Sequence, residues 1–365
     1  MPDQSSSEQH RSARLLSRVR RAGQLLTTPL HPDDYLQLLN PLWSARELRG
    51  RVERVEKVTD RSATLVIQPG WGWRFDHQAG QYIGIGVEMN GKFHWRSYSL
   101  SSMPVTEGGS VAITVKAMPE GFLSEHLVDG LAPGTIVRLE APQGDFVLPD
   151  PPPERMLFVV GGSGITPIMS MIRTMVRRRN MPDTTLVYSA AHEADMMFLE
   201  ELRELEGWLD WFTLHPRFTD TDGIVTPDQL DDLCPDWRKR ETWACGPQPM
   251  LDALVDHYEA HGLVDQLHVE RFTLAGVDTG AEGGTITFGD TGKTVEIDGA
   301  TTLLEAGEEA GVNMLFGCRM GICHTCDVPL VSGRVKDLRS GDEHEAGEYI
   351  QTCISVATTD CTLKV

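Results

Sequence analysis

The spacing of four cysteines near the C-terminus constrains this chain more than any other feature. Cys318, Cys323 and Cys326 are separated by four and then two residues, and Cys353 follows further along. Four thiolates suit iron, and this spacing is that of the ligands of a [2Fe–2S] cluster. Gly321, between the first two cysteines, suits a loop whose backbone must closely approach inorganic sulfide. The pattern predicts that these four cysteines bind such a cluster.

Two other interpretations of the cysteines are a structural zinc site and a disulfide framework. Zinc knuckles favour paired C-x2-C units, and this run holds a single such unit. Disulfide frameworks are typical of small secreted domains, whereas this chain has 365 residues and we expect no signal peptide. The iron–sulfur interpretation is therefore favoured.

The sequence around the cysteines resembles the plant-type ferredoxin family over residues 282–365. The resemblance rests on the run Leu303-Leu-Glu-Ala-Gly-Glu-Glu-Ala-Gly and on Ser332-Gly-Arg-Val. Thr302 and Glu305 are spaced as a capping box, and Gly311 stands where a C-cap glycine belongs, so a short helix is predicted between them. The family implies an α+β fold of the β-grasp type for this domain.

Composition indicates an ordinary globular protein of two or three domains. A formal net charge of −20 argues against nucleic acid as a partner, because phosphate binding requires a basic face. No apolar run is long enough for a membrane helix. The remaining cysteines, Cys234, Cys245 and Cys361, complete an inventory typical of a reduced compartment, so we expect a cytoplasmic location.

Residues 1–45 are predicted to form a helical extension. Between Ala13 and Leu26 the apolar residues fall on one helical face, with Arg14, Arg18, Arg20 and Arg21 around it. A basic amphipathic helix can lie on an anionic membrane surface, which would make the protein peripheral to the inner face of the plasma membrane. Packing of this helix on its own domain is the favoured alternative.

Residues 46–150 are predicted to form a β-barrel, because short alternating segments are separated there by glycine, proline and aspartate turns. The expected strands span 51–58, 63–68, 81–88, 94–100, 111–117 and 136–141. Within them, Arg96-Ser-Tyr98-Ser99-Leu-Ser resembles the flavin-binding signature of the ferredoxin-NADP reductase superfamily. The resemblance implies that Tyr98 stacks on the isoalloxazine ring, Ser99 lies near flavin N5 and Arg96 meets a phosphate. These roles suit an aromatic ring, a hydroxyl and a guanidinium.

The next run, from Lys116 to Ser124, follows the flavin signature as a Gly-x-x-Ser element does in the superfamily. Gly121 and Ser124 are predicted to open a helix whose exposed amides favour a pyrophosphate. The resemblance therefore implies cofactor-binding roles for Lys116, Gly121 and Ser124. FAD is the favoured flavin, and FMN stays open because no adenine-stacking aromatic residue is evident after Ser124.

Three consecutive prolines at 151–153 indicate a boundary, and residues 151–272 are predicted to form an α/β nucleotide-binding domain. A buried strand over Met156–Val160 leads into a glycine turn, and a helix is predicted from Pro167. A strand, a glycine turn and a helix make a phosphate-binding unit, although a glycine loop alone is weak evidence.

This glycine turn and the later run Cys245-Gly-Pro-Gln-Pro-Met together resemble the pyridine-nucleotide domain of the same superfamily. The resemblance implies that Gly162, Gly164 and Thr166 cradle the pyrophosphate and nicotinamide of the coenzyme. It also implies that Cys245 and Gly246 approach the site of hydride transfer, although a lone cysteine is usually a small buried hydrophobe.

Two residues near the end of this domain, Glu270 and Phe272, correspond to a glutamate and an aromatic residue that lie near the flavin in relatives. Ser99, Cys245 and Glu270 are therefore the residues expected to act in catalysis. The second strand of the domain ends near Ser189 without an acidic residue to bind a free 2′-hydroxyl. Ser189 and Arg217 are candidates to meet a 2′-phosphate, which favours NADPH and leaves NADH open.

Residues 273–281 are rich in glycine and threonine and are predicted to be a linker to the ferredoxin domain. The module order predicts an oxidoreductase that passes electrons from NAD(P)H through a flavin to a [2Fe–2S] cluster. The whole chain resembles ferredoxin reductases with a fused ferredoxin that serve bacterial oxygenases and desaturases.

The run Leu38-Leu-Asn-Pro-Leu-Trp resembles mycobacterial-type reductases paired with a membrane acyl-CoA desaturase. This resemblance implies a membrane-bound diiron partner, either a fatty acyl desaturase or an alkane hydroxylase. The alternatives are the reductase of a soluble ring-hydroxylating or demethylating oxygenase, and a non-catalytic redox sensor.

Overall fold

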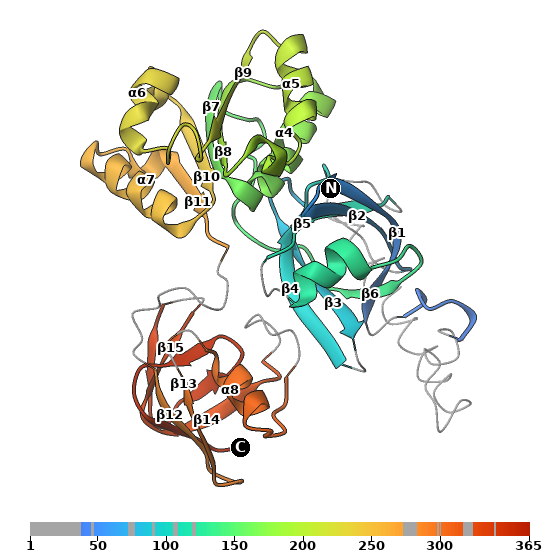
Figure 1. The fold of residues 1–365 in the computed structure, drawn as a ribbon, viewed down its shortest axis with the longest axis vertical. Coiled ribbons are helices and arrows are strands. Elements are labelled where there is room, and N and C mark those ends of the chain that lie inside the picture. The colour runs from blue at the N-terminus through green and yellow to red at the C-terminus, as the bar shows by residue number, and fades with distance from the viewer. Residues whose placement is uncertain are drawn as a thin grey trace, which may run out of the picture.

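The computed structural model arranges the chain in three parts, each with its own sheet and apolar core (Figure 1). It describes residues 38–44, 47–71, 77–89, 92–104, 109–118, 122–272, 283–297, 299, 301–316, 324–338 and 341–365. The predicted helix at 13–26, the predicted linker at 273–281, and Gly121, Cys318, Gly321 and Cys323 lie outside the described residues.

The first part is a six-stranded antiparallel sheet in the order β4-β3-β6-β1-β2-β5. A bridge between Leu100 and Ile113, at the two ends of this order, closes the sheet towards a barrel. Its strands are β1 (Leu48–Thr59), β2 (Ser62–Pro69), β3 (Tyr82–Met89), β4 (Lys92–Ser99), β5 (Val111–Lys116) and β6 (Ile136–Leu139). A short α3 (Phe122–Glu125) continues as the π-helix η1 (His126–Gly130). All six expected strands are confirmed.

The strand predicted to end at residue 141 ends at Leu139 instead. The backbone N–H of Glu140 still donates to the Gly84 carbonyl, at 2.9 Å. Pro142 has no N–H and interrupts the ladder, and pairing with β3 resumes in an isolated bridge between Gln143 and Tyr82.

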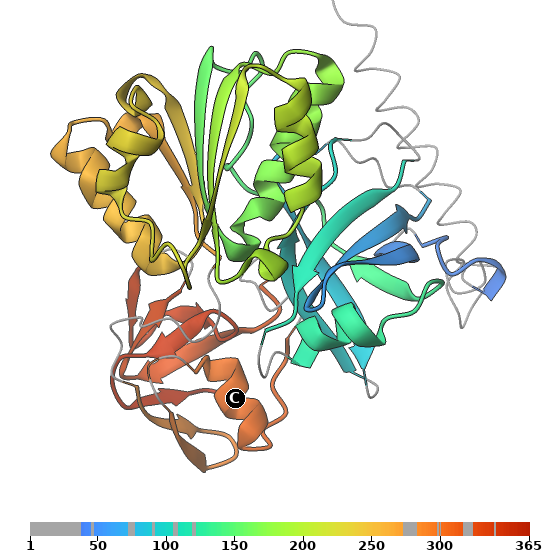
Figure 2. The same cartoon turned by 45° about the horizontal axis from the view of Figure 1, so that its top comes forward.

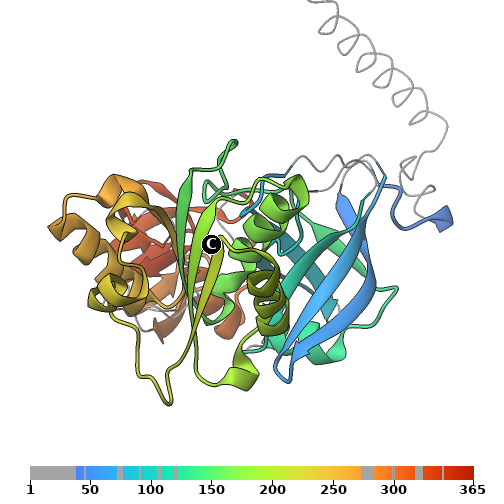
Figure 3. The same cartoon turned by 90° about the horizontal axis from the view of Figure 1, so that it is seen from above.

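The second part is a parallel sheet in the order β11-β10-β7-β8-β9, with α4 and α5 on the face towards the barrel and α6 and α7 on the other (Figures 1 and 3). Its strands are β7 (Arg155–Gly161), β8 (Asp183–Ala190), β9 (Phe212–Phe218), β10 (Glu241–Cys245) and β11 (Leu267–Glu270). Its helices are α4 (Ile165–Arg178), α5 (Leu199–Trp208), α6 (Leu230–Leu233) and α7 (Gln248–Ala260). Short 3-10 turns are η2 (Gly162–Gly164), η3 (Glu193–Asp195), η4 (Pro227–Gln229), η5 (Trp237–Lys239) and η6 (Val264–Gln266).

The helix predicted from Pro167 begins two residues earlier, at Ile165. The glycine turn is itself wound as η2, and the Ile165 N–H donates to the Gly162 and Ser163 carbonyls. The helix therefore continues directly from the turn, and Pro167 falls in its first turn, where a missing N–H costs nothing.

The third part is a mixed sheet in the order β13-β12-β19-β14-β17 with a three-stranded sheet β16-β15-β18. Its elements are β12 (Gly284–Phe288), β13 (Lys293–Ile297), α8 (Leu303–Glu309), β14 (Asp327–Ser332), β15 (Arg334–Asp337), β16 (Glu343–Glu345), β17 (Tyr349–Gln351), β18 (Ser355–Ala357) and β19 (Cys361–Leu363). It lies beneath the α/β part, on the side of the barrel that carries β3 and β4 (Figure 2). The predicted multidomain fold class is confirmed.

Helix α8 has the ends that its sequence predicts. Thr302 and Glu305 form the capping box, with the Glu305 N–H donating to Thr302 Oγ1 at 3.3 Å. At the other end Gly311 has φ 65°, and the N–H of Val312 reaches back to the Gly307 carbonyl, at 2.8 Å. This backbone pattern is a Schellman motif, which a glycine in the left-handed region permits.

Among the described residues no helix is long and apolar enough to span a bilayer.

Replacing Thr302 with Ala should destabilise the third part by about 1 kcal/mol, because the first turn of α8 loses its cap. Thr302→Ser keeps the hydroxyl and is the matched control. Thermal unfolding followed by visible absorbance of the iron–sulfur chromophore measures the difference, and equal midpoints for the two variants would contradict the prediction.

Candidate functional site

The C-terminal end of β4 in the barrel faces the C-terminal ends of β10 and β11 in the α/β part. Cys245 is fully buried, and it pairs in register with Glu270 on the neighbouring parallel strand. Cys245 Sγ lies 4.0 Å from Glu270 Oε2. Ser99 is 5% exposed, and its side chain lies beside the Glu270 carboxyl. The Ser99 hydroxyl favours the charged form of that carboxyl. The structure thus brings together the three residues that the sequence predicts to be catalytic.

Burial sets the protonation states of Glu270 and Cys245. It raises the pKa of the Glu270 carboxyl to about 8, although Ser99 lowers it somewhat. Burial, with the neighbouring Glu270 carboxyl as a second cause, raises the pKa of the Cys245 thiol well above its usual range. Desolvation disfavours the charged form of both acids, so at neutral pH both keep their protons. The Ser99 hydroxyl makes no hydrogen bond of standard geometry with the described residues.

Tyr98 and Arg96 lie two residues apart on β4 and therefore share one face of the strand. Tyr98 packs against the barrel core, and burial raises its pKa to about 12, with Arg96 opposing the shift. The exposed Arg96 side chain donates from Nη1 to the Trp95 carbonyl, at 3.0 Å. The face thus offers a neutral aromatic ring beside a guanidinium.

The glycine turn between β7 and α4 lies against the run that begins at Cys245. A side chain at Gly164 would meet the Cys245 carbonyl oxygen at 2.1 Å, so only glycine fits. Gly246 is equally confined, since a Cβ there would lie 2.9 Å from the Gly161 nitrogen. Gly162 has φ 53° and open space where a side chain would stand, and Tyr188 Oη donates to its carbonyl at 3.1 Å.

Thr166 is buried in the first turn of α4, and its hydroxyl donates to the Ser163 carbonyl at 3.0 Å. That contact stabilises the glycine turn while the first amides of α4 remain directed beyond the helix end, where an anion is favoured. The geometry suits the phosphate cradle that the sequence predicts from Gly162 to Thr166.

The other predicted cofactor residues lie on the barrel and just after β11. Lys116 ends β5 and pairs with Ser62 on β2. Ser124 lies within α3, and its Oγ accepts a hydrogen bond from the Met118 N–H at 3.1 Å. Phe272, two residues after Glu270, is 36% exposed.

In the third part, Cys326 and Cys353 bring their sulfurs within 3.3 Å of each other. A disulfide requires about 2.05 Å, so the two sulfurs are not bonded. The Cys353 thiol, as the main cause, lowers the pKa of Cys326, which favours the thiolate that iron requires. Thr352 fixes the pair by donating from Oγ1 to the Cys326 carbonyl, at 3.1 Å. The described half of the cysteine set therefore fits a thiolate-bound metal cluster.

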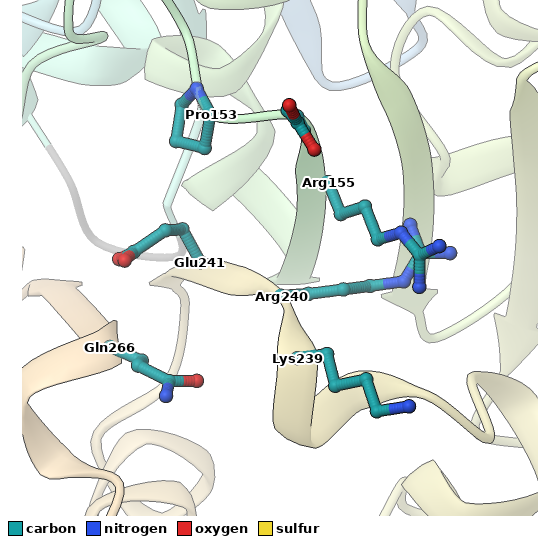
Figure 4. Close-up of a pocket in the computed structure, with 7 residues that line it drawn as sticks. Pro153, Arg155, Lys239, Arg240, Glu241 and Gln266 are labelled. Atoms are coloured by element: carbon teal, nitrogen blue, oxygen red, sulfur yellow. The ribbon is translucent and has the colours of Figure 1, made fainter.

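A surface depression of about 480 Å³ lies elsewhere (Figure 4). Arg155 and Glu241 start strands β7 and β10, so the depression lies at the amino edge of the parallel sheet. Ligands of open α/β sheets bind at the carboxyl edge. Two of its basic groups are also engaged, since Arg155 pairs with Asp236 and Arg240 with Asp183, each at 3.0 Å. We assign no cofactor to it.

Sequence reasoning missed the side chains that join the barrel to the α/β part. Ser170 and Arg173 on α4 donate to the carbonyls of Ser102 and Ser101, at the end of the flavin signature, each at 2.6 Å. The helical pattern marks α4 as amphipathic but says nothing of which neighbour its polar face meets.

Three family models match successive stretches of the chain. They are the oxidoreductase FAD-binding domain at residues 51–148, the oxidoreductase NAD-binding domain at 158–256 and the 2Fe-2S iron-sulfur cluster binding domain at 286–358.

Similar proteins span nearly the whole chain. It is 53% identical over 349 residues to the NADPH oxidoreductase of Mycobacterium tuberculosis, covering 95% of this chain and 92% of that protein. It is 30% identical over 320 residues to the glycine betaine monooxygenase reductase subunit of Pseudomonas aeruginosa, covering 79% and 87%. The structure of phthalate dioxygenase reductase superposes with a TM-score of 0.63 at 24% identity, covering 88% of this chain and 98% of that one.

This chain belongs to the family of FAD- and NAD-binding oxidoreductases that carry a C-terminal 2Fe-2S domain. It is an NAD(P)H-dependent electron-transfer reductase whose cofactors are FAD, NAD(P)H and a [2Fe–2S] cluster. The superfamily resemblance predicted from the sequence is confirmed.

Gly164→Ala should disrupt the nucleotide turn, because the new methyl group overlaps the Cys245 backbone. We expect a loss of about 1–3 kcal/mol of stability and weaker nucleotide binding, measured by denaturant unfolding and by titration with NADP⁺. Gly207→Ala, on α5 with no atom within 4 Å of the added methyl, is the control and should gain up to about 1 kcal/mol. A Gly164→Ala variant as stable as the native chain would refute this account of the turn.

The raised pKa of Glu270 makes stability depend on pH. The folded-state pKa of about 8 lies above the ordinary value of 4.5, so between them the folded chain holds the extra proton. This contribution is present at low pH and is lost as pH rises towards about 8. Glu270→Gln should flatten that part of the stability curve, and the exposed Asp265→Asn should not. Unfolding midpoints across this range test it, and parallel curves for Glu270→Gln and the native chain would contradict it.

Proposed function

We propose that this chain takes hydride from NADPH and delivers single electrons to a membrane-bound diiron enzyme, a fatty acyl desaturase or an alkane hydroxylase. The observation that carries the reductase chemistry is the meeting of Ser99, Cys245 and Glu270 where the barrel contacts the α/β part. The choice of NADPH is supported by the 53% identity to an NADPH oxidoreductase.

The residues present fit the cofactors. Tyr98 offers a ring, Arg96 an exposed guanidinium and Ser99 a buried hydroxyl without a standard hydrogen bond, which together suit a flavin. Lys116, Gly121, Ser124 and Phe272 are assigned to the same cofactor. Gly162, Gly164, Thr166 and Gly246 are assigned to the coenzyme, and Cys318, Cys323, Cys326 and Cys353 to the cluster. When bound, these groups supply the conversion of a hydride's electron pair into single electrons.

The chain's own contribution at this centre is a set of neutral groups. With a pKa of about 8, the Glu270 carboxyl holds its proton at neutral pH and has a hydrogen to donate. The neutral thiol of Cys245 adds no charge beside it. A largely buried, uncharged contact limits the access of water, which protects a transferred hydride from side reactions.

A membrane partner is supported by the start of the described chain. Leu38 and Leu39 are 80% and 77% exposed, and Trp71 is 69% exposed. The Trp71 N–H donates to the Leu42 carbonyl at 3.2 Å, which holds this apolar segment beside the barrel. Exposed apolar side chains near a basic amphipathic sequence suit a peripheral contact with a bilayer. The predicted helix at 13–26, which supplies the basic residues, lies outside the described residues.

The second candidate is the reductase of a soluble oxygenase. It is favoured by the similarity to the reductase subunit of glycine betaine monooxygenase. The two candidates share the same internal electron path and differ in the acceptor, so only a measurement with the acceptor separates them.

Stopped-flow mixing of the purified holoprotein with NADPH or NADH tests the internal path. We expect flavin absorbance to fall before cluster absorbance, faster with NADPH. Reconstitution with membranes that contain a diiron desaturase then tests the acceptor. NADPH-dependent desaturation supports the proposal, whereas its absence together with turnover of a soluble oxygenase would establish the second candidate.

Coenzyme choice should depend on Arg217, which pairs in register with Ser189 at the carboxyl edge of the sheet. Its guanidinium makes two long contacts to Asp222, with Nε 4.0 Å from Oδ2 and Nη2 donating to the backbone carbonyl at 3.5 Å. A charge-assisted contact to a 2′-phosphate is worth about 1.5–3 kcal/mol, so Arg217→Gln should lower kcat/KM for NADPH roughly 10- to 100-fold and spare NADH. Arg203→Gln, which breaks an exposed pair with Glu193, is the control. An equal loss with both coenzymes would exclude this role.

A further inference from the structure

Two side chains on α4 hold the backbone that leaves the flavin signature. Ser170 Oγ donates to the Ser102 carbonyl at 2.6 Å, and Arg173 Nη1 donates to the Ser101 carbonyl at 2.6 Å. We call Ser170 and Arg173 the interdomain clamp. The carbonyls it holds lie two and three residues after Ser99.

Contacts within the α/β part fix the Arg173 side chain in place. Its Nε and Nη2 donate to the two carboxylate oxygens of Glu201 on α5, at 2.8 and 2.6 Å. The guanidinium also lies over the Phe198 ring, 4.9 Å from its centroid. A planar guanidinium can make this forked pair and a third contact together, which the ammonium of a lysine cannot.

The held backbone at Ser101 and Ser102, which we call the strap, belongs to the barrel. The Ser101 N–H donates to the Ala112 carbonyl at 2.8 Å, and the Ser101 hydroxyl bonds Thr114 Oγ1 at 2.8 Å. The Ala112 N–H in turn donates to Ser102 Oγ, at 3.0 Å. The strap therefore moves with β5, and the clamp ties it to α4 in the α/β part.

The same helix carries the nucleotide turn. Thr166, Ser170 and Arg173 stand at i, i+4 and i+7, so they share one face of α4. Thr166 stabilises the glycine turn at one end of that face, and the clamp holds the barrel further along it. A shift of α4 against the strap would move the nucleotide turn relative to Ser99.

We propose that the interdomain clamp sets the distance between the nucleotide turn and Ser99, and that Arg173 is a positioning residue for hydride transfer. This inference rests on the proposed function. Other contacts keep the two parts docked without it, since Trp243 Nε1 donates to the Val147 carbonyl at 3.3 Å and Phe146 and Leu148 pack in the core of the α/β part. Loss of the clamp therefore changes alignment rather than association.

The test compares Arg173→Lys with the matched control Arg178→Gln in the holoprotein. Arg178 lies on the same helix in an exposed pair with Asp150, at 3.1 Å. We expect Arg173→Lys to slow flavin reduction by NADPH roughly 10- to 100-fold, because displacements of about 1 Å cost this much. The dissociation constant for NADP⁺ should stay unchanged, so kcat falls without a matching rise in KM.

A second readout does not depend on turnover. Hydrogen exchange of the backbone amides in the segment 100–103 should accelerate in Arg173→Lys and stay native in Arg178→Gln. Glu201→Gln should show a smaller effect of the same sign. Combined with Arg173→Lys it should add little, because both changes remove the same forked pair.

Native exchange in the segment 100–103 together with native flavin reduction in Arg173→Lys would overturn the proposal. Accelerated hydrogen exchange in Arg173→Lys with an unchanged rate of flavin reduction would also overturn the proposal. The clamp would then hold the two parts together without positioning the groups for hydride transfer. If the native chain itself is not reduced by NADPH or NADH, the proposed function fails, and the exchange result still reports whether the clamp holds the strap.

Discussion

The contact between the end of β4 and the carboxyl edge of the parallel sheet is the constraint on which the rest of the structure depends. Ser99 and Glu270 meet there, although they come from different folding units and are far apart in the chain. Burial at this contact raises the pKa of the Glu270 carboxyl and of the Cys245 thiol, so both stay protonated at neutral pH. A loosely docked pair of domains would admit water and lose this property.

Close backbone packing makes that contact possible. The turn at Gly164 and the run at Cys245 approach so nearly that a methyl group on Gly164 cannot be placed. The parallel strands β7 and β10 are hydrogen-bonded neighbours, so their ends emerge side by side and their loops must share little space. The glycines in both motifs therefore serve packing between the loops.

The three parts differ in how they are held together. The barrel and the α/β part share buried apolar residues and several hydrogen bonds, which suits a fixed alignment for hydride transfer. The third part has its own core, closed by α8 and the β-strands around it. A separate core is consistent with a unit that receives an electron from one neighbour and presents it to another.

The sequence by itself determined the identity and order of the three modules. Cysteine spacing, alternating strands, a capped helix and a glycine turn are local patterns, each set by residues a few positions apart, and all six barrel strands and α8 were predicted from them. Only the tertiary structure decided which carboxyl is neutral, which helix face holds the barrel and which surface depression lies at the wrong edge of the sheet. These properties depend on desolvation and on contacts between distant segments, and neither leaves a periodic signal in the chain.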